Sequence, residues 1–220
     1  MTLHYQASLS QRCESRGVRL TAAQLDRLTQ YLELLLSWRP HLNLTGLRDA
    51  ESMMDVLIVE SLDFLQGDFL RPGMRVLDLG TGAGVPGIPL GICRPDIHLT
   101  LLDRTAKKIA FLQRAVEALQ LENCLPLCKP AEEFARLLPS TQRFDAIVTR
   151  GAGSIAHLLA LTGSLLRAGG PLLLRKPADT PELHAARRLL ASAAWGKLRR
   201  VILPQSGSAK WVLLAISRAS

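Results

Sequence analysis

The chain has 220 residues, 48% of them hydrophobic and 21% charged, and its 27 Lys and Arg outnumber its 19 Asp and Glu for a formal net charge of +8. This length suits one α/β domain with a small additional segment, and the positive charge is compatible with a nucleic-acid partner. No apolar run is long enough to cross a bilayer, and the first residues lack the apolar centre of a signal peptide, so we expect a cytoplasmic globular protein that does not bind membranes.

Residues 20–38 carry the pattern of an amphipathic helix. Thr21 and Gln24 have the spacing of a capping box, and leucines recur after them at helical intervals. Pro40 ends the pattern because proline cannot continue a helix. The apolar stripe predicts packing against the rest of the protein, and we assign it no chemistry.

A second helix is predicted from Asp49, which can cap it, to Leu65. Three polar residues lie on the connector before this helix: Asn43, Thr45 and Arg48. They either form a rim that faces a substrate or serve only as turn residues.

The strongest motif is RVLDLGTGAGVPG, residues 75–87. It is a short apolar strand that contains Asp78 and then runs into closely spaced glycines: Gly80, Gly82, Gly84 and Gly87. Glycine has no Cβ, so such a run lets the backbone turn tightly and exposes N–H groups to a ligand. The motif therefore predicts a nucleotide-binding loop, followed by a helix that begins near Pro86.

Two cofactor classes can use this loop. Gly82, Gly84 and Gly87 satisfy the dinucleotide pattern G-x-G-x-x-G, which is a weak signal when it occurs alone. Here, however, Gly80 closes the strand and Asp78 precedes the turn, where a carboxylate repels a pyrophosphate and attracts a cation. This favours S-adenosylmethionine, which has an ammonium and a sulfonium group and no phosphate, over NAD. A glycine-rich turn without a ligand is the third alternative.

Residues 97–103 predict a buried strand that ends at Asp103. An acid at the end of the second strand is where nucleotide-binding α/β folds hold the ribose hydroxyls. The alternative is that Asp103 caps the helix predicted over residues 105–119, and the two roles are compatible.

A third strand is predicted over residues 124–129. In this architecture the following loop lies over the adenine, so Ala131 and Glu132 are expected to contact the base, although Glu132 can instead only stabilise a helix N-terminus. Cys124 and Cys128 fall on one face of the strand and are predicted to be small buried side chains. The four cysteines lack zinc-ligand spacing, and no metal site is predicted.

The fourth and fifth strands supply the candidate catalytic residues. The fourth ends at Thr149 and Arg150, and the fifth, residues 171–176, carries Arg175 and Lys176 to the same edge of the sheet. Ligands of open α/β sheets bind at the carboxyl ends of the strands. We therefore expect Arg150 and Lys176 to position a substrate base, with a solvated arginine as the alternative for Arg150.

The remaining pattern completes the fold. One helix is predicted through Leu158, Leu161 and Leu165, ending at Gly169 and Gly170, and another over 181–195. Two closing strands are predicted over 198–204 and 210–218. Alternation of strands and helices predicts an α/β fold with a mostly parallel sheet and an antiparallel edge strand. The one plausible boundary lies near residues 71–73, which divides the chain into an N-terminal helical extension, 1–72, and a main domain, 73–220.

Five stretches together resemble a known family: NLTGLRD, VLDLGTGAGVPGIPLGICRPD, LTLLDRTAKKIAFLQ, PAEEF and FDAIVTRGAG. They are similar to the bacterial small-subunit ribosomal RNA methyltransferase G family, also called glucose-inhibited division protein B. The resemblance implies a Rossmann-like class I methyltransferase with a seven-stranded sheet. It also implies an S-adenosylmethionine-dependent enzyme that methylates N7 of a guanine in 16S rRNA. The expected partner is 16S rRNA or the small ribosomal subunit, and we expect a monomer without a metal.

The resemblance also implies which residues bind the cofactor. They are Gly80 and Val85 in the glycine loop, Ala131 and Glu132 after the third strand, and Arg150 after the fourth; Asp78 and Asp103 match the acids of the wider methyltransferase class. With Gly82 and Gly84, these residues make up the expected cofactor site.

Two places depart from the family pattern. The family usually has His-Ile-Leu-Asp-Ser where this chain has Leu57, Ile58, Val59, Glu60 and Ser61. The family also tends to have glycine after the lysine of the fifth strand, where this chain has Pro177.

Guanine N7 has an exposed lone pair and no proton to remove, so we predict no general base and a mechanism based on positioning. The residues expected to contact RNA phosphates are Arg48, Arg175, Arg187, Arg188, Arg199 and Arg200. The alternatives are a methyltransferase for another RNA nucleotide, a small molecule or a protein, an NAD-dependent oxidoreductase, and a non-catalytic RNA-binding relative.

Overall fold

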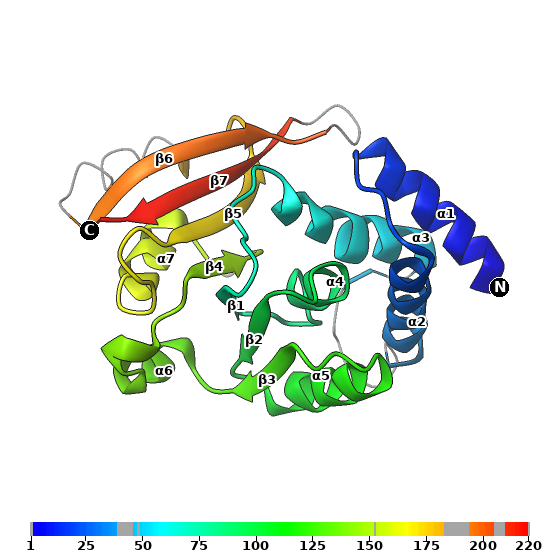
Figure 1. Ribbon diagram of the computed structural model, residues 1–220, viewed down its shortest axis with the longest axis horizontal. Helices are drawn as coiled ribbons and strands as arrows, with labels where there is room; N and C mark the ends of the chain where they lie inside the picture. The colour runs from blue at the N-terminus through cyan, green and yellow to red at the C-terminus, as the bar shows by residue number, and fades with distance from the viewer. Residues whose placement is uncertain are drawn as a thin grey trace.

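A seven-stranded sheet forms the centre of the protein, in the order β3-β2-β1-β4-β5-β7-β6 (Figure 1). The computed structural model describes residues 2–38, 46–47, 49–151, 153–182, 194–204 and 210–219. The strands are β1 (Arg75–Leu79), β2 (His98–Asp103), β3 (Cys124–Cys128), β4 (Ala146–Thr149), β5 (Pro171–Pro177), β6 (Trp195–Ile202) and β7 (Trp211–Arg218). The α-helices are α1 (Thr2–Ser15), α2 (Ala22–Trp38), α3 (Ala50–Met53), α4 (Gly87–Cys93), α5 (Ala106–Ala118), α6 (Ala131–Leu137) and α7 (Ile155–Thr162). A π-helical turn η1 (Met54–Ile58) and the 3-10 helices η2 (Val59–Leu65) and η3 (Ser140–Gln142) complete the described elements.

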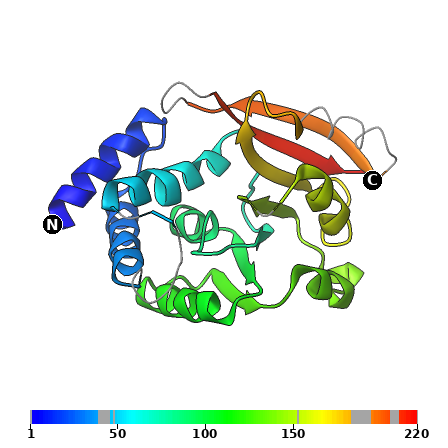
Figure 2. The same ribbon diagram turned by 180° about the vertical axis from the view of Figure 1, so that it is seen from behind.

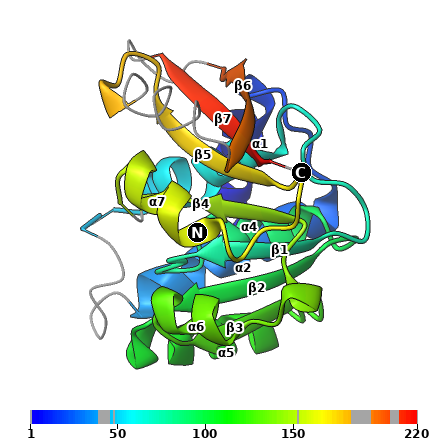
Figure 3. The same cartoon turned by 90° about the vertical axis from the view of Figure 1, so that its left-hand side faces the viewer.

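The sheet is parallel from β3 to β5, and β7 is antiparallel to both of its neighbours, β5 and β6. Figure 3 shows the strands stacked in this order. The predicted mostly parallel sheet and the pairing of the last two strands are therefore confirmed, with the antiparallel strand one place inside the edge. Because β1, β2 and β4 are parallel, the residues that follow them, Gly80, Arg104 and Arg150, come to the same edge of the sheet.

Different helices cover the two faces of the sheet (Figures 1 and 2). Side chains alternate along a strand, so Val76 of β1 joins a core with α1, α2, η1, η2, α4 and α5, whereas Leu77 and Leu79 join a core with α6 and α7. Asp78 lies on the face of Val76, beneath α4, and hydrogen-bonds the backbone N–H of Gly87.

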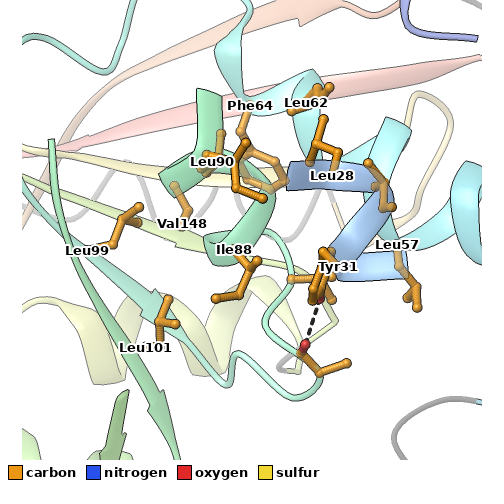
Figure 4. Close-up of a cluster of buried hydrophobic side chains, with 14 of the residues drawn as sticks. Leu28, Tyr31, Leu57, Leu62, Phe64, Ile88, Leu90, Leu99, Leu101 and Val148 are labelled. Atoms are coloured by element: carbon orange, nitrogen blue, oxygen red, sulfur yellow. Dashed lines mark hydrogen bonds between the residues drawn. The ribbon is translucent and has the colours of Figure 1, made fainter. Parts of the chain in front are cut away.

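The N-terminal helices are part of the first of these cores. The predicted capping box is confirmed, because Thr21 N donates to Gln24 Oε1 at 2.9 Å and Gln24 N donates to Thr21 Oγ1 at 3.2 Å. Figure 4 shows Leu28 and Tyr31 of α2 packed with side chains of α4 and the sheet. Each fully buried side chain of this kind contributes about 1.5–3 kcal/mol. Residues before and after position 72 thus share one core, and the division there stays a prediction about the chain.

The helix predicted from Asp49 to Leu65 consists of three helical types in sequence, α3, η1 and η2. Asp49 caps it as predicted, since Oδ1 accepts from Ser52 N at 2.7 Å. A π turn holds more residues than an α turn, so the side chains after it point in different directions from those of a continuous α-helix. Asp63 faces the interior, with 2% of its surface exposed.

Four details differ from the sequence expectations. Helix α1 was not predicted, because it has few apolar residues; Leu9 and Cys13 are its buried ones. Helix α7 ends at Thr162, before Leu165. Trp195 begins β6, although it was placed at the end of a helix whose residues 183–193 lie outside the described part of the chain. Cys128 is exposed, which contradicts its predicted burial, because it is the last residue of the edge strand β3.

Candidate functional site

The glycine loop after β1 has a backbone that few other residues adopt. Gly80, Gly82 and Gly84 have φ angles of 71°, 59° and 97°, in the left-handed region that favours glycine. The N–H groups of Gly80 and Thr81 both donate to the carbonyl of Leu102, at 2.9 and 3.0 Å, which fixes the loop against the end of β2.

Asp78 fixes the glycine loop through hydrogen bonds to its side chain. It is fully buried, and Oδ2 accepts from the Thr81 hydroxyl at 2.6 Å and from Gly87 N at 2.8 Å. Its other carboxylate oxygen has no hydrogen-bond partner among the described residues. Burial raises the pKa of Asp78 to about 7, although the hydrogen bonds from Thr81 and Gly87 oppose this shift. The predicted contact of Asp78 with a cofactor cation stays a prediction.

Gly87 is required by close packing between α4 and the sheet. A Cβ at this position would lie 2.2 Å from Leu101 Cδ2 and 2.6 Å from Asp78 Oδ2. The side chains of Leu101 and Asp78 thus occupy the space that a Cβ at position 87 would need. The absence of a Cβ lets Asp78 accept from Gly87 N.

A cavity of about 430 Å³ opens beyond the ends of β1 and β2, and we call it the strand-end cavity. It brings together four of the predicted cofactor residues, Gly80, Asp103, Ala131 and Glu132. The other residues that line it are Leu79, Leu102, Arg104, Thr105, Lys108, Lys129, Gly151, His157 and Leu161.

Asp103 lies in the wall of the strand-end cavity with 8% of its surface exposed. Its Oδ1 accepts from Thr105 N at 2.9 Å, and its Oδ2 accepts from Gly82 N at 3.0 Å. The carboxylate therefore joins the end of β2 to the glycine loop. The residue before α5 is Thr105, so the alternative that Asp103 is the N-cap of this helix is wrong.

A second cavity, of about 280 Å³, is lined by residues 80–83 and 85 of the glycine loop, and we call it the loop cavity. It contains three predicted cofactor residues, Gly82, Val85 and Arg150, and shares Gly80 with the strand-end cavity. Its remaining lining residues are Gly46, Leu47, Val56, Leu57, Thr81 and Ala83. The two cavities therefore adjoin at Gly80. Gly84 lines neither.

Arg150 reaches the loop cavity with 18% of its side chain exposed. Its Nη1 donates to the carbonyl of Val56 and lies 3.7 Å from Glu60 Oε2. Burial lowers the pKa of Arg150, and the charge of Glu60 opposes this shift. Arg150 is thus a paired arginine and not a solvated one.

Lys176, the other candidate catalytic residue, lines neither cavity. It alternates with Arg175 along β5, and its Nζ donates to Glu182 Oε2 at 3.0 Å. Glu182 also accepts from Ile155 N at the start of α7, which places Lys176 on the α7 face of the sheet. Its predicted role in positioning a base stays a prediction.

The predicted phosphate contacts divide into three groups. Arg199 and Arg200 are exposed on the edge strand β6. Arg175 has only 6% of its surface exposed and is paired with acids, so its predicted phosphate contact is wrong. The other three arginines, Arg48, Arg187 and Arg188, lie outside the described residues. Asn43 and Thr45 of the predicted rim lie outside them as well.

Two contributors to the site were not predicted from the sequence. The Tyr31 hydroxyl of α2 donates to the carbonyl of Ala83 at 2.7 Å (Figure 4), and Tyr31 is fully buried. Glu60 pairs with Arg150 from η2. Nothing in the spacing of these residues indicates either contact, because the partners are far apart along the chain.

This chain is similar to known proteins in sequence and in fold. A family model described as rRNA small subunit methyltransferase G matches residues 24–202. "Ribosomal RNA small subunit methyltransferase G" of Lachnoclostridium phytofermentans is 34% identical over 189 residues, which are 86% of this chain and 78% of that protein. The protein of the same name from Neisseria meningitidis serogroup C is 39% identical over 154 residues, 70% of this chain and 71% of that one.

Solved structures share the fold at lower identity. A SAM-dependent methyltransferase from Aquifex aeolicus has a TM-score of 0.57 and 18% identity, over 76% of this chain and 93% of that one. Another, from Thiobacillus denitrificans in complex with S-adenosyl-L-homocysteine, has a TM-score of 0.51 and 18% identity, over 74% and 92% of the two chains. These similarities confirm the Rossmann-like class I methyltransferase fold.

Proposed function

Since this chain belongs to the rRNA small subunit methyltransferase G family, we propose that it transfers a methyl group from S-adenosylmethionine to N7 of a guanine in 16S ribosomal RNA. The observation that carries this proposal is the pair of cavities that adjoin at Gly80 on the carboxyl edge of the sheet. A cofactor with a nucleoside at one end and a charged amino acid at the other fits two adjoining spaces of different chemistry.

The strand-end cavity suits the nucleoside. Asp103 Oδ1 accepts one backbone N–H and retains a lone pair for a ribose hydroxyl. Oδ2, which accepts from Gly82 N, also lies 3.5 Å from Lys108 Nζ. Ala131 and Glu132 line the same cavity from the start of α6, where they can contact the edge of an adenine.

The glycine loop suits the amino-acid end. The unpartnered oxygen of Asp78 lies beneath the loop, where negative charge favours an ammonium or sulfonium group and disfavours a pyrophosphate. When bound, S-adenosylmethionine supplies a methyl group activated by its positive sulfur. This electrostatic preference, together with the family, supports a methyltransferase over an NAD-dependent oxidoreductase.

The loop cavity suits a transfer that needs no base. Among the described residues that line it, Arg150 is the one ionisable side chain, and neither a histidine nor a carboxylate is present. Guanine N7 has a free lone pair, so the task of the site is to hold the base in line with the methyl group. We assign this to Arg150, with Lys176 as a second candidate at the end of β5.

The partner is 16S rRNA or the small ribosomal subunit. The formal net charge of +8 and the exposed Arg199 and Arg200 support binding to a polyanion. The target guanine must leave its stack to enter the site, which favours a loop or partly assembled RNA. We further propose a cytoplasmic monomer that works without a metal.

Two findings on the described residues bear on these proposals. None of their helices is long and apolar enough to span a membrane. They also contain no cluster of His, Cys, Asp and Glu with the makings of a metal site.

A second candidate is methyl transfer to a different RNA nucleotide. It is favoured by Leu57, which lines the loop cavity at the position where the family usually has histidine. An apolar side chain there changes how the cavity can recognise a base.

The test is transfer of labelled methyl from S-adenosylmethionine to purified 16S rRNA and to intact small subunits, both lacking the modification, with the product mapped by nucleoside analysis. We expect label in 7-methylguanosine, inhibition by S-adenosylhomocysteine and no binding of NAD. Label in another nucleoside would support the second candidate. Binding of NAD without S-adenosylhomocysteine would reject both.

A further inference from the structure

A continuous row of paired charges runs from the end of α1 to the loop cavity. Arg16 donates from Nη1 to both oxygens of Asp63, at 2.9 Å each. Asp63 Oδ2 also accepts from Arg175 Nε at 2.7 Å, and Arg175 Nη2 lies 3.1 Å from Glu60 Oε1. Glu60 Oε2 in turn lies 3.7 Å from Nη1 of Arg150. We call these five residues the charge row.

Positive and negative members alternate along the charge row, and most of it is buried. The side chains of Arg16, Asp63 and Arg175 are 6%, 2% and 3% exposed. Loss of one partner from such a pair leaves an uncompensated charge in the interior, so each member constrains the next. Trp211 adds to this constraint, because the guanidinium of Arg175 stacks on its ring at 4.0 Å.

The members come from distant parts of the chain. Arg16 follows α1, Glu60 and Asp63 lie in η2, Arg175 lies in β5, and Arg150 follows β4. Of these, Arg150 is the one that lines the loop cavity. The row therefore connects the first helix of the protein to the candidate active site without passing through the glycine loop.

The described contacts of Arg150 all use one of its nitrogen atoms. Within the described residues, its hydrogen bond and its ion pair are both made by Nη1, to the carbonyl of Val56 and to Glu60. A guanidinium has five N–H donors in a fixed planar arrangement. Val56 and Glu60 therefore hold the Nη1 end of the group, and Nε and Nη2 make no hydrogen bond or ion pair with the described residues.

We propose that Glu60 is a positioning residue that orients Arg150 toward the bound cofactor and base, and that Asp63, Arg175 and Arg16 hold Glu60 in place. On this view the N-terminal helices support the candidate active site, because Arg16, which follows α1, is the member of the charge row farthest from Arg150. The inference rests on the proposed function only in assigning Arg150 to the cofactor site.

The experiment is a mutant cycle between Glu60 and Arg150. We expect Glu60→Gln to raise the Kd for S-adenosylhomocysteine and to lower kcat by roughly tenfold or more, since a misplacement of about 1 Å can cost about 100-fold. The KM for RNA should change little. In an Arg150→Ala background, Glu60→Gln should change Kd and kcat by less than about twofold, because it then has no arginine to orient. Glu60→Asp keeps the charge and should restore most of the activity.

Glu51→Gln is the matched control. Glu51 lies in the same helical run and pairs with Arg12 of α1, but its side chain is 48% exposed and it is not part of the charge row. This variant should bind and turn over like the wild type. Thermal unfolding of every variant separates loss of fold from loss of orientation.

Two results would overturn the inference: a Glu60→Gln enzyme as active as Glu51→Gln, or equal losses from Glu60→Gln with and without Arg150. Failure of the proposed function has a different signature. A wild type that binds S-adenosylhomocysteine but methylates no RNA rejects the substrate, and the cycle measured in Kd still decides the role of Glu60. A wild type that binds no S-adenosylhomocysteine removes Arg150 from a cofactor site and rejects both.

Discussion

The two cavities that adjoin at Gly80 are built in different ways. The strand-end cavity is held through backbone N–H groups: the Leu102 carbonyl and the Asp103 carboxylate accept hydrogen bonds from N–H groups of the glycine loop. The loop cavity is held by side chains that meet across the fold, because Arg150 contacts Val56 and Glu60. The strand-end cavity can thus be specified by a short motif, whereas the loop cavity depends on contacts between segments that are far apart in the chain.

The difference also divides the chemistry. Acidic and basic side chains both line the strand-end cavity, whereas the loop cavity has the guanidinium of Arg150 among mostly apolar residues. Two ligands should therefore distinguish substitutions in the two regions. The affinity for adenosine should depend on the strand-end cavity, and the affinity for S-adenosylhomocysteine should depend on both cavities.

The largest effect is expected from Asp63→Asn. Asp63 is 2% exposed and lies between Arg16 and Arg175, so the change leaves buried positive charges without their partner. We expect the free energy of unfolding to fall by about 3–5 kcal/mol, measured by urea denaturation. Glu51→Gln, at an exposed pair, should cost no more than about 1 kcal/mol. Equal losses in the two variants would show that the charge row is no stronger than a surface pair.

The next effect is expected from Asp103→Asn. Gly82 N and Thr105 N bind different oxygens of Asp103, so the NH2 group of an asparagine would face one of these donors. Hydrogen bonds to a charged acceptor contribute about 1.5–3 kcal/mol. We expect the Kd for adenosine and for S-adenosylhomocysteine to rise about 10- to 100-fold in calorimetric titrations.

Two comparisons sharpen this result. Asp96→Asn removes an exposed acid that pairs with Arg94, away from both cavities, and should leave binding unchanged. Glu60→Gln should weaken S-adenosylhomocysteine but not adenosine. If Glu60→Gln weakened adenosine as strongly as Asp103→Asn does, the two cavities would not be separate units.

A smaller effect on stability is expected from Gly87→Ala, which acts on the element common to both regions. The added Cβ would meet Leu101 Cδ2 at 2.2 Å and Asp78 Oδ2 at 2.6 Å, and overpacking of this kind costs about 1–3 kcal/mol. Because Asp78 ties both ends of the loop, we expect weaker binding of adenosine and of S-adenosylhomocysteine together. Gly163→Ala, where the nearest atoms lie at 3.6 and 3.9 Å, is the control and should leave both affinities unchanged.

The sequence was sufficient for the backbone-held region. The motif around Asp78 and the acid at the end of β2 follow from strand ends and glycine spacing, and the structure places Gly80, Asp103, Ala131 and Glu132 around one cavity. Such residues can be predicted because parallel strands bring their carboxyl ends to one edge whatever the rest of the chain does.

The side-chain-held region was not predictable in the same way. Arg175 and Lys176 are neighbours in sequence, but strand alternation sends them to opposite faces, one to Asp63 and the other to Glu182. Which acid pairs with which arginine depends on packing between segments about a hundred residues apart, as with Asp63 and Arg175. The periodicity of the sequence does not indicate which of these groups will pair. It likewise does not indicate the hydrogen bond from Tyr31 to the carbonyl of Ala83.

The predicted contact between the buried carboxyl of Asp78 and a cofactor cation would couple cofactor binding to the release of protons. With a pKa of about 7, Asp78 is partly protonated in the free protein at neutral pH. A ligand ammonium near its unpartnered oxygen favours the ionised form and lowers this pKa, so binding should release protons to the solvent. The binding enthalpy of S-adenosylhomocysteine at pH 7 should then vary with the ionisation enthalpy of the buffer, while that of uncharged adenosine should not. The protonation of a carboxyl group that solvent does not reach would thus depend on the charge of the ligand bound at the loop.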